Sequence, residues 1–322
     1  MGRNVKNLIS AFDFDGAEAQ AIFDLAGRVK MNPSAYRDLF VGRVMGLIFE
    51  KPSTRTWISF DAGFSTMGGH SIYLGPNDIE LGVREEVRDV ARTLERYLDV
   101  VVMRTYEHDV ISEFASYFGK PVINGLSNLE HPAQALTDFF TMREKLGNIK
   151  GKKIAFVGDG NNVLNSLLIL AARLGLHFVF ATPKECAPKK AVLSRVMKEA
   201  KKTKAKLVWT NHPEEAVKGA DIVYTDVWVS MGEESEEGKK KHFKGFQVNR
   251  ALMAKAAKGA YFMHCLPAHR GEEVTNDILE GKQSIVFDQA ENRLHVQKAI
   301  LIYLLGTSRP SRSVSQMDNE SE

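Results

Sequence analysis

Residues 49–60 read FEKPSTRTWISF and place three hydroxyl groups and one guanidinium at consecutive positions, Ser53 to Thr56. This set follows an apolar run typical of a buried strand and opens a segment with a helical pattern. Exposed N–H groups at the start of a helix favour an anion, and a guanidinium binds phosphate through two parallel hydrogen bonds. Capping by Ser53 or Thr54 would explain one hydroxyl, but not three together with Arg55. We therefore predict a phosphate-binding segment here.

Three further segments place polar side chains where a predicted strand ends or a helix begins. Arg104 ends an apolar strand, where an arginine can bind an anion or form a salt bridge at the rim. His131 stands at a predicted helix start, with Gln134 one turn later on the same face. Such a histidine stays neutral and can donate a hydrogen bond to a carbonyl, although it could equally be a cap. Arg293, at another helix start, is a third candidate anion ligand.

The second half of the chain carries a different set of polar residues at its strand ends. Asp226 ends a predicted strand and Ser230 follows four positions later, and a carboxylate there suits an ammonium group. The segment AFVGDGNNVLNS is similar to a dinucleotide fingerprint, but Val163 occupies the third glycine position, so no nicotinamide cofactor is predicted. Asn161 and Asn162 could instead bind a small polar ligand.

Cys265 lies just beyond another predicted strand, in the segment FMHCLPAHRG. Zinc binding by His264, Cys265 and His269 is conceivable, but no second pair of ligands stands nearby in the sequence. We therefore predict neither a metal nor a cofactor.

Short β-rich runs alternate with amphipathic helical segments, which predicts parallel sheets built from strand–helix–strand units. The predicted strands are 44–49, 71–75, 99–104, 121–125, 153–158, 177–182, 221–226, 261–266 and 284–289. This number favours an α/β fold of two domains, each a parallel β-sheet flanked by helices, joined by interdomain helices. Ligands of such sheets bind at the carboxyl ends of the strands, where the polar residues stand.

The polar segment around 144–153 is the predicted break between the domains. We assign residues 1–147 to the first domain, with a C-terminal helix at 292–305 packing back onto it, and residues 148–291 to the second. Residues 306–322 form a polar tail that we expect to be disordered.

Composition excludes several classes of function. The 322 residues carry 43 basic and 40 acidic side chains, a net charge of +3, which is too balanced for a nucleic-acid-binding protein. Two cysteines make no disulfide framework, and no apolar run reaches the roughly 18 residues of a membrane span. The N-terminus lacks the apolar core of a signal peptide. We therefore expect a cytoplasmic protein without nucleic-acid or membrane partners.

Six motifs, in this order, resemble those of the transcarbamylase family, and within it the ornithine carbamoyltransferases. They are FEKPSTRT, HPAQALTD, GDGNNV, DVWVSMG, HCLPAHRGEEV and AENRLHVQKA. The resemblance implies transfer of the carbamoyl group of carbamoyl phosphate to the side-chain amine of L-ornithine, giving citrulline and phosphate without a cofactor. It also implies a homotrimer, or a multiple of trimers, with active sites between subunits. Whether the cell uses the reaction for arginine biosynthesis or in the reverse direction stays open.

The resemblance also implies roles for individual residues. The implied ligands of carbamoyl phosphate are Ser53, Thr54, Arg55, Thr56, Glu80, Arg104, His131, Gln134, Cys265, Leu266 and Arg293. The implied ligands of ornithine are Asn162, Asp226, Ser230 and Met231. The implied catalytic residues are Arg104, His131, Cys265 and Asp226.

Two positions depart from the family pattern. Trp57 replaces the arginine that ends Ser-Thr-Arg-Thr-Arg, and Glu80 replaces the glutamine of Asp-Ile-Gln-Leu-Gly. Trp57 lies about 200° around the helix from Arg55, so we expect it to face a neighbouring element or subunit, with Glu80 supplied by the adjoining subunit. These departures leave open a different amine, such as putrescine or an acylated ornithine, and a non-catalytic homologue that binds an anion or amino acid. Asp226 with the Ser-Met-Gly segment argues against a different amine, and the presence of all presumed catalytic residues except Glu80 argues against a non-catalytic homologue.

Overall fold

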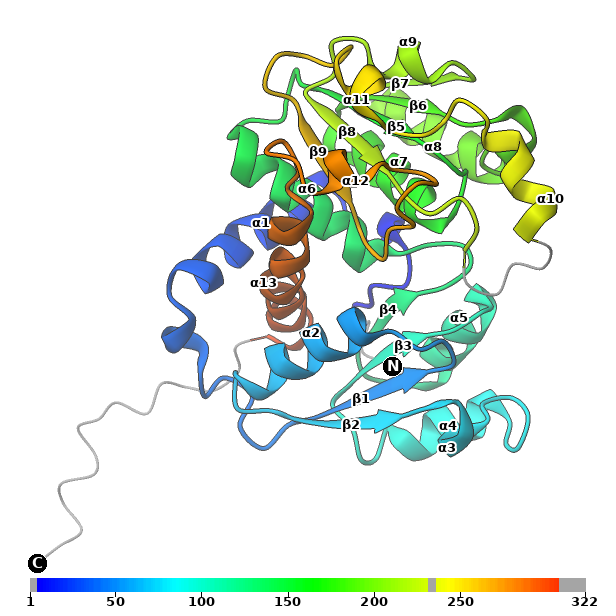
Figure 1. The fold of residues 1–322 in the computed structure, drawn as a ribbon. Coiled ribbons are helices and arrows are strands. Elements are labelled where there is room, and N and C mark those ends of the chain that lie inside the picture. Colours follow the sequence, from blue (N-terminus) through cyan, green and yellow to red (C-terminus); the bar gives the residue numbers. More distant parts are fainter. Residues whose placement is uncertain (1–4, 231–235, 307–322) are drawn as a thin grey trace, which may run out of the picture.

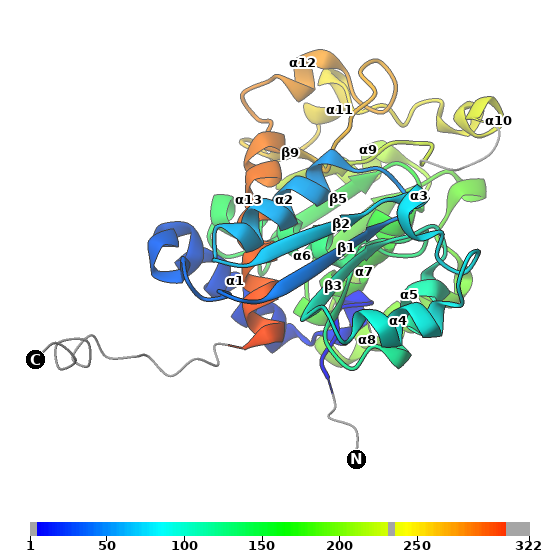
Figure 2. The same cartoon turned by 90° about the horizontal axis from the view of Figure 1, so that it is seen from below.

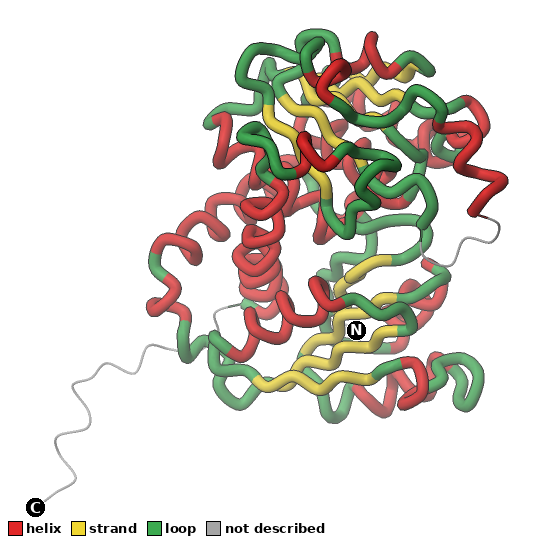
Figure 3. The backbone as a smooth tube through the Cα atoms, viewed as in Figure 1, coloured by secondary structure: helices red, strands yellow, loops and turns green. Residues whose placement is uncertain are grey.

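The computed structural model describes residues 5–230 and 236–306, which form two parallel β-sheets flanked by helices. Figure 1 shows one sheet in the lower half of the molecule and the other in the upper half, with α6 and α13 running between them. In Figure 3 the strands of each sheet lie between helical layers. The predicted α/β fold of two sheet-based units joined by helices is therefore confirmed.

The N-terminal sheet has four parallel strands in the order β2-β1-β3-β4. They are β1 (Val44–Phe49), β2 (His70–Leu74), β3 (Val100–Arg104) and β4 (Val122–Leu126). Successive side chains of β1 and β3 alternate between two apolar clusters, so both faces of the sheet are buried. Helix α2 covers one face while α4 and α5 cover the other (Figure 2). The helices of this half are α2 (Thr54–Ser65), α3 (Pro76–Ile79), α4 (Val87–Leu94) and α5 (His108–Tyr117).

The C-terminal sheet has five parallel strands in the order β7-β6-β5-β8-β9. They are β5 (Lys153–Val157), β6 (His177–Ala181), β7 (Lys206–Thr210), β8 (Ile222–Thr225) and β9 (Tyr261–His264). Its helices are α7 (Asn162–Leu174), α8 (Lys190–Thr203), α9 (Pro213–Val217), α10 (Glu236–Lys240), α11 (Arg250–Met253) and α12 (Asn276–Leu279). The short 3-10 helices of the chain are η1 (Ala11–Asp13), η2 (Pro33–Tyr36), η3 (Lys184–Cys186) and η4 (Lys241–Phe243).

Three long helices connect the two halves. They are α1 (Gly16–Met31), α6 (Pro132–Leu146) and α13 (Val286–Leu305). Helix α13 packs against α1, α2 and α6, and its buried apolar residues belong to the same cluster as those of α6 and α7. Lys30 of α1 pairs with Glu144 of α6 at 2.8 Å and donates to Asn292 of α13 at 2.8 Å. Packing and polar contacts therefore hold the connecting helices together.

Two strand predictions need correction. The predicted strand at 284–289 is wrong, because only Ser284 forms an isolated bridge, with Phe262, before α13 begins at Val286. The β-propensity of this short apolar run is overridden by burial of the helix that it opens. Strand β7 was not predicted, because it is a short edge strand with only three apolar residues, and no residue of it is fully buried. The C-terminal helix also begins earlier than the predicted residue 292.

The domain boundary at residues 147 and 148, which falls between the end of α6 and the start of β5, stays a prediction. The predicted tail lies, beyond Gly306, outside the described residues. Among the described helices, none is both long enough and apolar enough to cross a membrane.

Candidate active site

A cavity of about 1160 Å³ lies where the carboxyl ends of the two sheets face each other. Its walls come from the segments that follow β1, β3 and β4 in one half and β5, β8 and β9 in the other. Most of the predicted site residues line it: Ser53, Arg55, Thr56, Arg104, His131, Gln134, Asn162, Asp226, Ser230, Cys265, Leu266 and Arg293. The structure therefore brings together residues from all six sequence motifs.

Three predicted residues are not placed in this cavity. Thr54 is the exposed first residue of α2, and Glu80 is exposed at the end of α3, with a backbone φ of 42°. Neither side chain lines the cavity of its own chain. Met231 lies outside the described residues.

The start of α2 combines a cap with ligand-facing groups. Ser53 is the N-cap: its hydroxyl accepts from the Thr56 N–H at 3.3 Å and donates to the Thr56 hydroxyl at 3.0 Å. Capping thus accounts for one hydroxyl of the segment, while Arg55 and Thr56 also reach the cavity. The Trp57 ring instead packs at a tilt against Tyr73 of β2, with ring centroids 4.5 Å apart. The predicted orientation of this tryptophan, towards a neighbouring element, is therefore confirmed.

One wall of the cavity concentrates positive charge. Arg104 and Arg293 are buried, and burial lowers the pKa of each guanidinium to about 10. The nearby charge of Arg55 acts in the same direction and is part of both shifts. Arg293 donates to Thr56 Oγ1 at 2.7 Å, but the Nε atoms of Arg104 and Arg293 have no partner among the described residues. Because buried donors need acceptors, this wall is built for an anion.

His131 lies against this cationic wall, directly before α6. Its backbone N–H donates to the Ser166 hydroxyl at 2.8 Å, and its side-chain Nδ1 has no partner among the described residues. Burial, followed by the charges of Arg293 and Arg104, lowers the pKa of His131 well below its usual value. The imidazole is therefore neutral and able to donate one hydrogen bond to a carbonyl oxygen.

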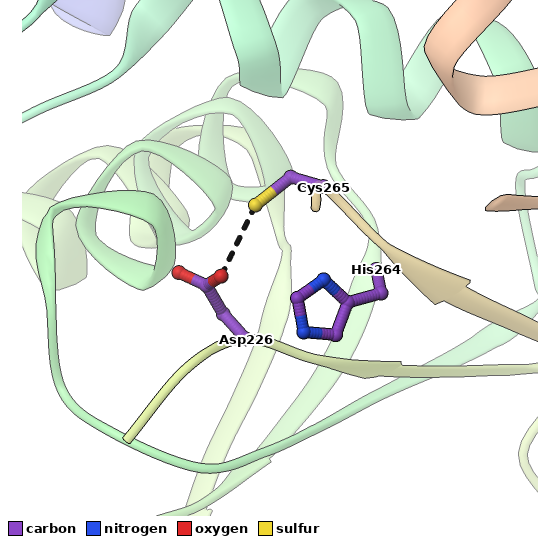
Figure 4. Close-up of side chains that lie close together, drawn as sticks. All are labelled: Asp226, His264 and Cys265. Atoms are coloured by element: carbon purple, nitrogen blue, oxygen red, sulfur yellow. Dashed lines mark hydrogen bonds between the residues drawn. The ribbon is translucent and has the colours of Figure 1, made fainter. Parts of the chain in front are cut away.

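The opposite wall carries a buried carboxylate. The Cys265 thiol donates to Asp226 Oδ1 at 3.1 Å (Figure 4), and Asn161 Nδ2 donates to Asp226 Oδ2 at 2.7 Å. Burial, and then the charges of Asp226 and Asp138, raise the pKa of the Cys265 thiol well above its usual value. Cys265 is therefore a neutral hydrogen-bond donor rather than a thiolate.

The side chain of His264 lies close to Asp226 and Cys265 (Figure 4), a grouping that invites comparison with a metal site. Its Nδ1 accepts from the Leu266 N–H at 2.8 Å, and its Nε2 lies 3.2 Å from the Glu273 carboxylate. Both ring nitrogens are thus already engaged, and the histidine instead fixes the backbone of Leu266. This arrangement does not favour metal binding by these side chains.

Asn162 and Ser230 also line the cavity, and we count them with Asp226 as its second wall. Asn162 Nδ2 donates to the carbonyl of Ser127 at 2.6 Å, and its Oδ1 accepts from the Val163 N–H at 2.9 Å. Asn162 therefore also connects the start of α7 with the loop after β4.

Sequence reasoning missed several polar residues of the cavity, of which Lys51 is the clearest. Its side chain is buried, donates to Asn128 Oδ1 at 2.5 Å and lies 4.3 Å from the centre of the Tyr106 ring. Lys51 belongs to the FEKPSTRT motif, so its position two residues before Ser53 was an available signal. Asn128 stands in an irregular loop, where no sequence pattern indicates it.

Comparison with known families agrees with this geometry. A family described as "Aspartate/ornithine carbamoyltransferase, carbamoyl-P binding domain" matches residues 6–144, and its "Asp/Orn binding domain" matches residues 150–304. The chain belongs to the aspartate/ornithine carbamoyltransferase family. The resemblance predicted from the six motifs is therefore confirmed, and so is the prediction of a carbamoyl-transferring enzyme.

Similar proteins cover nearly the whole chain. The chloroplastic ornithine carbamoyltransferase of Pisum sativum is 48% identical over 95% of this chain and 82% of its own length. The ornithine carbamoyltransferase of Methanoculleus marisnigri is 46% identical over 93% and 97% of the two chains. Among solved structures, the ornithine carbamoyltransferase of Pyrococcus furiosus has a TM-score of 0.89 and 43% identity, covering 94% of this chain and 97% of its own.

Proposed function

We propose that this enzyme transfers the carbamoyl group of carbamoyl phosphate to the side-chain amine of L-ornithine, giving L-citrulline and phosphate. The observation that carries the proposal is one cavity with two unlike walls: a buried arginine cluster on one side and the Asp226–Cys265 pair on the other. An anionic electrophile fits the first wall, and a substrate with an amine fits the second. The names of the similar proteins support ornithine as that substrate.

The phosphate of carbamoyl phosphate is assigned to the start of α2 and to the arginines. Ser53, Arg55 and Thr56 supply hydroxyl and guanidinium donors, and Arg104 and Arg293 supply further charge. Thr54, as the first residue of α2, is assigned a role through its helix N-terminal N–H. Phosphate is the leaving group of the reaction, so donors that bind it also stabilise the negative charge it gains as its bond to carbon breaks.

The carbamoyl group is assigned to the position between His131, Gln134, Cys265 and Leu266. The neutral imidazole of His131 and the guanidinium of Arg104 are the donors for the carbonyl oxygen. When the amine attacks the carbonyl carbon, this oxygen becomes an oxyanion, and fixed donors stabilise it without reorganisation. The departing phosphate then restores the carbonyl as the carbon–oxygen bond breaks.

Ornithine is assigned to Asn162, Asp226, Ser230 and Met231. A free side-chain amine with a pKa near 10.4 is neutral in only about one molecule in a few thousand at pH 7, and only the neutral form attacks. The nitrogen must lose protons before and after the carbon–nitrogen bond forms, and the carboxylate of Asp226 is the acceptor placed beside Cys265. Alignment of both substrates in one cavity supplies a further part of the rate.

We further propose a homotrimer, or a multiple of trimers, in which Glu80 reaches the cavity of a neighbouring copy. Two facts support this: Glu80 is exposed and does not line its own cavity, and apolar side chains of the same half are exposed. Ile58 of α2 is 54% exposed and Ile72 of β2 is 41% exposed. Light scattering should give a mass that is a multiple of three times 35.9 kDa.

Product analysis tests the proposed reaction. Purified protein with carbamoyl phosphate and ornithine should form citrulline, while putrescine, an N-acylated ornithine and aspartate should give at most traces of their carbamoyl products. Carbamoylation of putrescine or the acylated ornithine, without citrulline formation, would reject ornithine as the substrate. Turnover of none of these amines would favour a non-catalytic homologue.

A further inference from the structure

Asp138 is a buried carboxylate that lies behind the cavity rather than in it. It sits on α6, has no exposed surface and does not line the cavity. Its Oδ1 accepts from Gln134 Nε2 at 2.8 Å and from Gln289 Nε2 at 2.7 Å, and its Oδ2 accepts from the Tyr224 hydroxyl at 3.0 Å. Three donors from α6, α13 and β8 therefore converge on one carboxylate.

The amide of Gln134 is held at both ends by this arrangement. Its Nε2 donates to Asp138, four residues later on the same face of α6, while its Oε1 accepts from Arg293. Arg293 is itself fixed by its 2.7 Å hydrogen bond to Thr56. Reversing the amide would place an acceptor against the carboxylate and a donor against the guanidinium. Asp138 and Arg293 together therefore keep the oxygen of Gln134 on the cavity side.

A Gln134 oxygen that faces the cavity can distinguish carbamoyl phosphate from acyl phosphates that have no NH2 group. The NH2 of a carbamoyl group donates hydrogen bonds, whereas the methyl group of an acetyl group has the same place and no donor. An amide oxygen has two lone pairs, and Arg293 uses one of those on Gln134. The second lone pair is available to accept from a carbamoyl NH2.

We propose that Asp138 is a positioning residue that orients the Gln134 amide and thereby makes the site select carbamoyl phosphate over acyl phosphates without an NH2. This rests on the proposed function, because it assigns the carbamoyl group to the position beside Gln134. Asp138 itself touches neither substrate.

The cost of burying this carboxylate supports a specific role. Burial raises the pKa of Asp138 to about 7, because desolvation destabilises the charged carboxylate. The three hydrogen-bond donors offset part of this destabilisation. Gln289 extends the network, since its Oε1 accepts from the His264 N–H at 3.0 Å, next to Cys265. An apolar side chain of the same size would fill this space without desolvating a charge.

Dissociation constants measured by calorimetry on the full-length chain test the proposal. The probes are carbamoyl phosphate, acetyl phosphate and inorganic phosphate, and the variants are Asp138→Asn, Asp138→Leu and Tyr224→Phe. We expect the wild type to prefer carbamoyl over acetyl phosphate by about tenfold or more, and Asp138→Leu to bring this ratio within about threefold of one. Affinities of Asp138→Leu for acetyl phosphate and inorganic phosphate should stay within about twofold of wild type, because these ligands do not need the Gln134 oxygen.

Two variants act as matched controls. Asp138→Asn keeps an acceptor oxygen for both glutamines and should keep the preference. Tyr224→Phe removes the donor to the other oxygen of the carboxylate and should lower stability without changing the preference. If Asp138→Leu does not fold, Asp138→Ser replaces it in the same measurements.

The outcomes separate positioning from stability. An unchanged ratio in a folded variant without the carboxylate, or equal weakening of all three ligands, would overturn the inference. Failure of both Asp138→Leu and Asp138→Ser to fold, with Asp138→Asn folded, would also overturn it by assigning the carboxylate to stability alone. A wild type that does not bind carbamoyl phosphate would reject the proposed function instead.

Discussion

The two walls of the cavity meet opposite electrostatic demands. The wall of the N-terminal half holds Arg55, Arg104 and Arg293, with guanidinium donors left without partners among the described residues. On the wall of the C-terminal half, both oxygens of Asp226 already accept a hydrogen bond, from Cys265 and Asn161. The first wall therefore has donors available for an anionic ligand. On the second wall, two neutral donors already stabilise the charge of Asp226.

This difference indicates which wall controls the binding of each substrate. An anion that binds to the cationic wall reduces the repulsion between its guanidinium groups. This wall should therefore bind carbamoyl phosphate strongly in the absence of ornithine. A substrate ammonium at the other wall must compete with Cys265 and Asn161 for the same carboxylate. We therefore expect the first wall to control affinity for carbamoyl phosphate and the second to control the use of ornithine.

Removal of Arg104 should have the largest effect. Arg104→Met keeps an unbranched, flexible side chain but removes a donor from both the phosphate and the developing oxyanion. Loss of one such donor lowers kcat/KM by about 10²- to 10³-fold. Steady-state kinetics with carbamoyl phosphate as the varied substrate measures this, and a melting curve serves as the folding control. A loss below about threefold would remove Arg104 from the reacting centre.

Asp226→Asn should have the next largest effect, and a selective one. The substitution keeps the shape of the side chain and removes the charge assigned to the ornithine amine. Loss of one hydrogen bond to a charged group costs about 1.5–3 kcal/mol, which is about 10- to 150-fold in kcat/KM for ornithine. Kinetics with ornithine as the varied substrate measures the effect. An unchanged kcat/KM would show that the carboxylate does not act on the amine.

His131 allows a smaller test through pH. Its pKa in the folded state lies below the unfolded value of about 6.5, so below that pH the unfolded chain binds a proton that the folded chain does not. Stability should therefore fall as pH decreases through 6.5, with His131 contributing up to about 1.4 kcal/mol per pH unit. His131→Asn should flatten the slope of unfolding free energy between pH 6.5 and 5. Equal slopes for both proteins would show that burial beside the cationic wall does not depress this pKa.

Substitutions at Trp57 and Glu80, the two departures from the family pattern, should have the smallest effect on kcat/KM. Trp57 packs on Tyr73 of its own chain, and we place Glu80 at a neighbouring cavity. If the two are coupled between subunits, Trp57→Arg combined with Glu80→Gln should keep activity, and each single change should cost more than the pair. A double-mutant cycle on kcat/KM measures the coupling. An interaction energy below about 0.5 kcal/mol would make the two positions independent.

The walls also differ in how far sequence alone could predict them. Ser53 to Thr56 form a contiguous motif that follows a strand, so their types and spacing are enough to indicate an anion site. Asp226 and Cys265 are each recognisable at a strand end, but their hydrogen bond arises from the pairing of β8 with β9. The family resemblance, rather than periodicity, supplies the role of each residue in the second wall.

The network behind the cavity could not be predicted. Asp138, Tyr224 and Gln289 come from three elements far apart in the chain, and each residue type is ordinary in its local segment. Tertiary packing alone makes them neighbours. Tertiary packing also explains why the strand predicted at 284–289 was wrong. There the packing of α13 against the other connecting helices overrides the local β-propensity.

Equilibrium binding of carbamoyl phosphate, without ornithine, tests the division between the walls most directly. Calorimetric titration should give wild-type affinity within about twofold for Asp226→Asn, because that carboxylate lies on the opposite wall, and a loss of about tenfold or more for Arg104→Met. Similar losses of carbamoyl phosphate affinity in both variants would contradict the account, because they would mean that the Asp226 carboxylate controls carbamoyl phosphate binding as much as the arginines do.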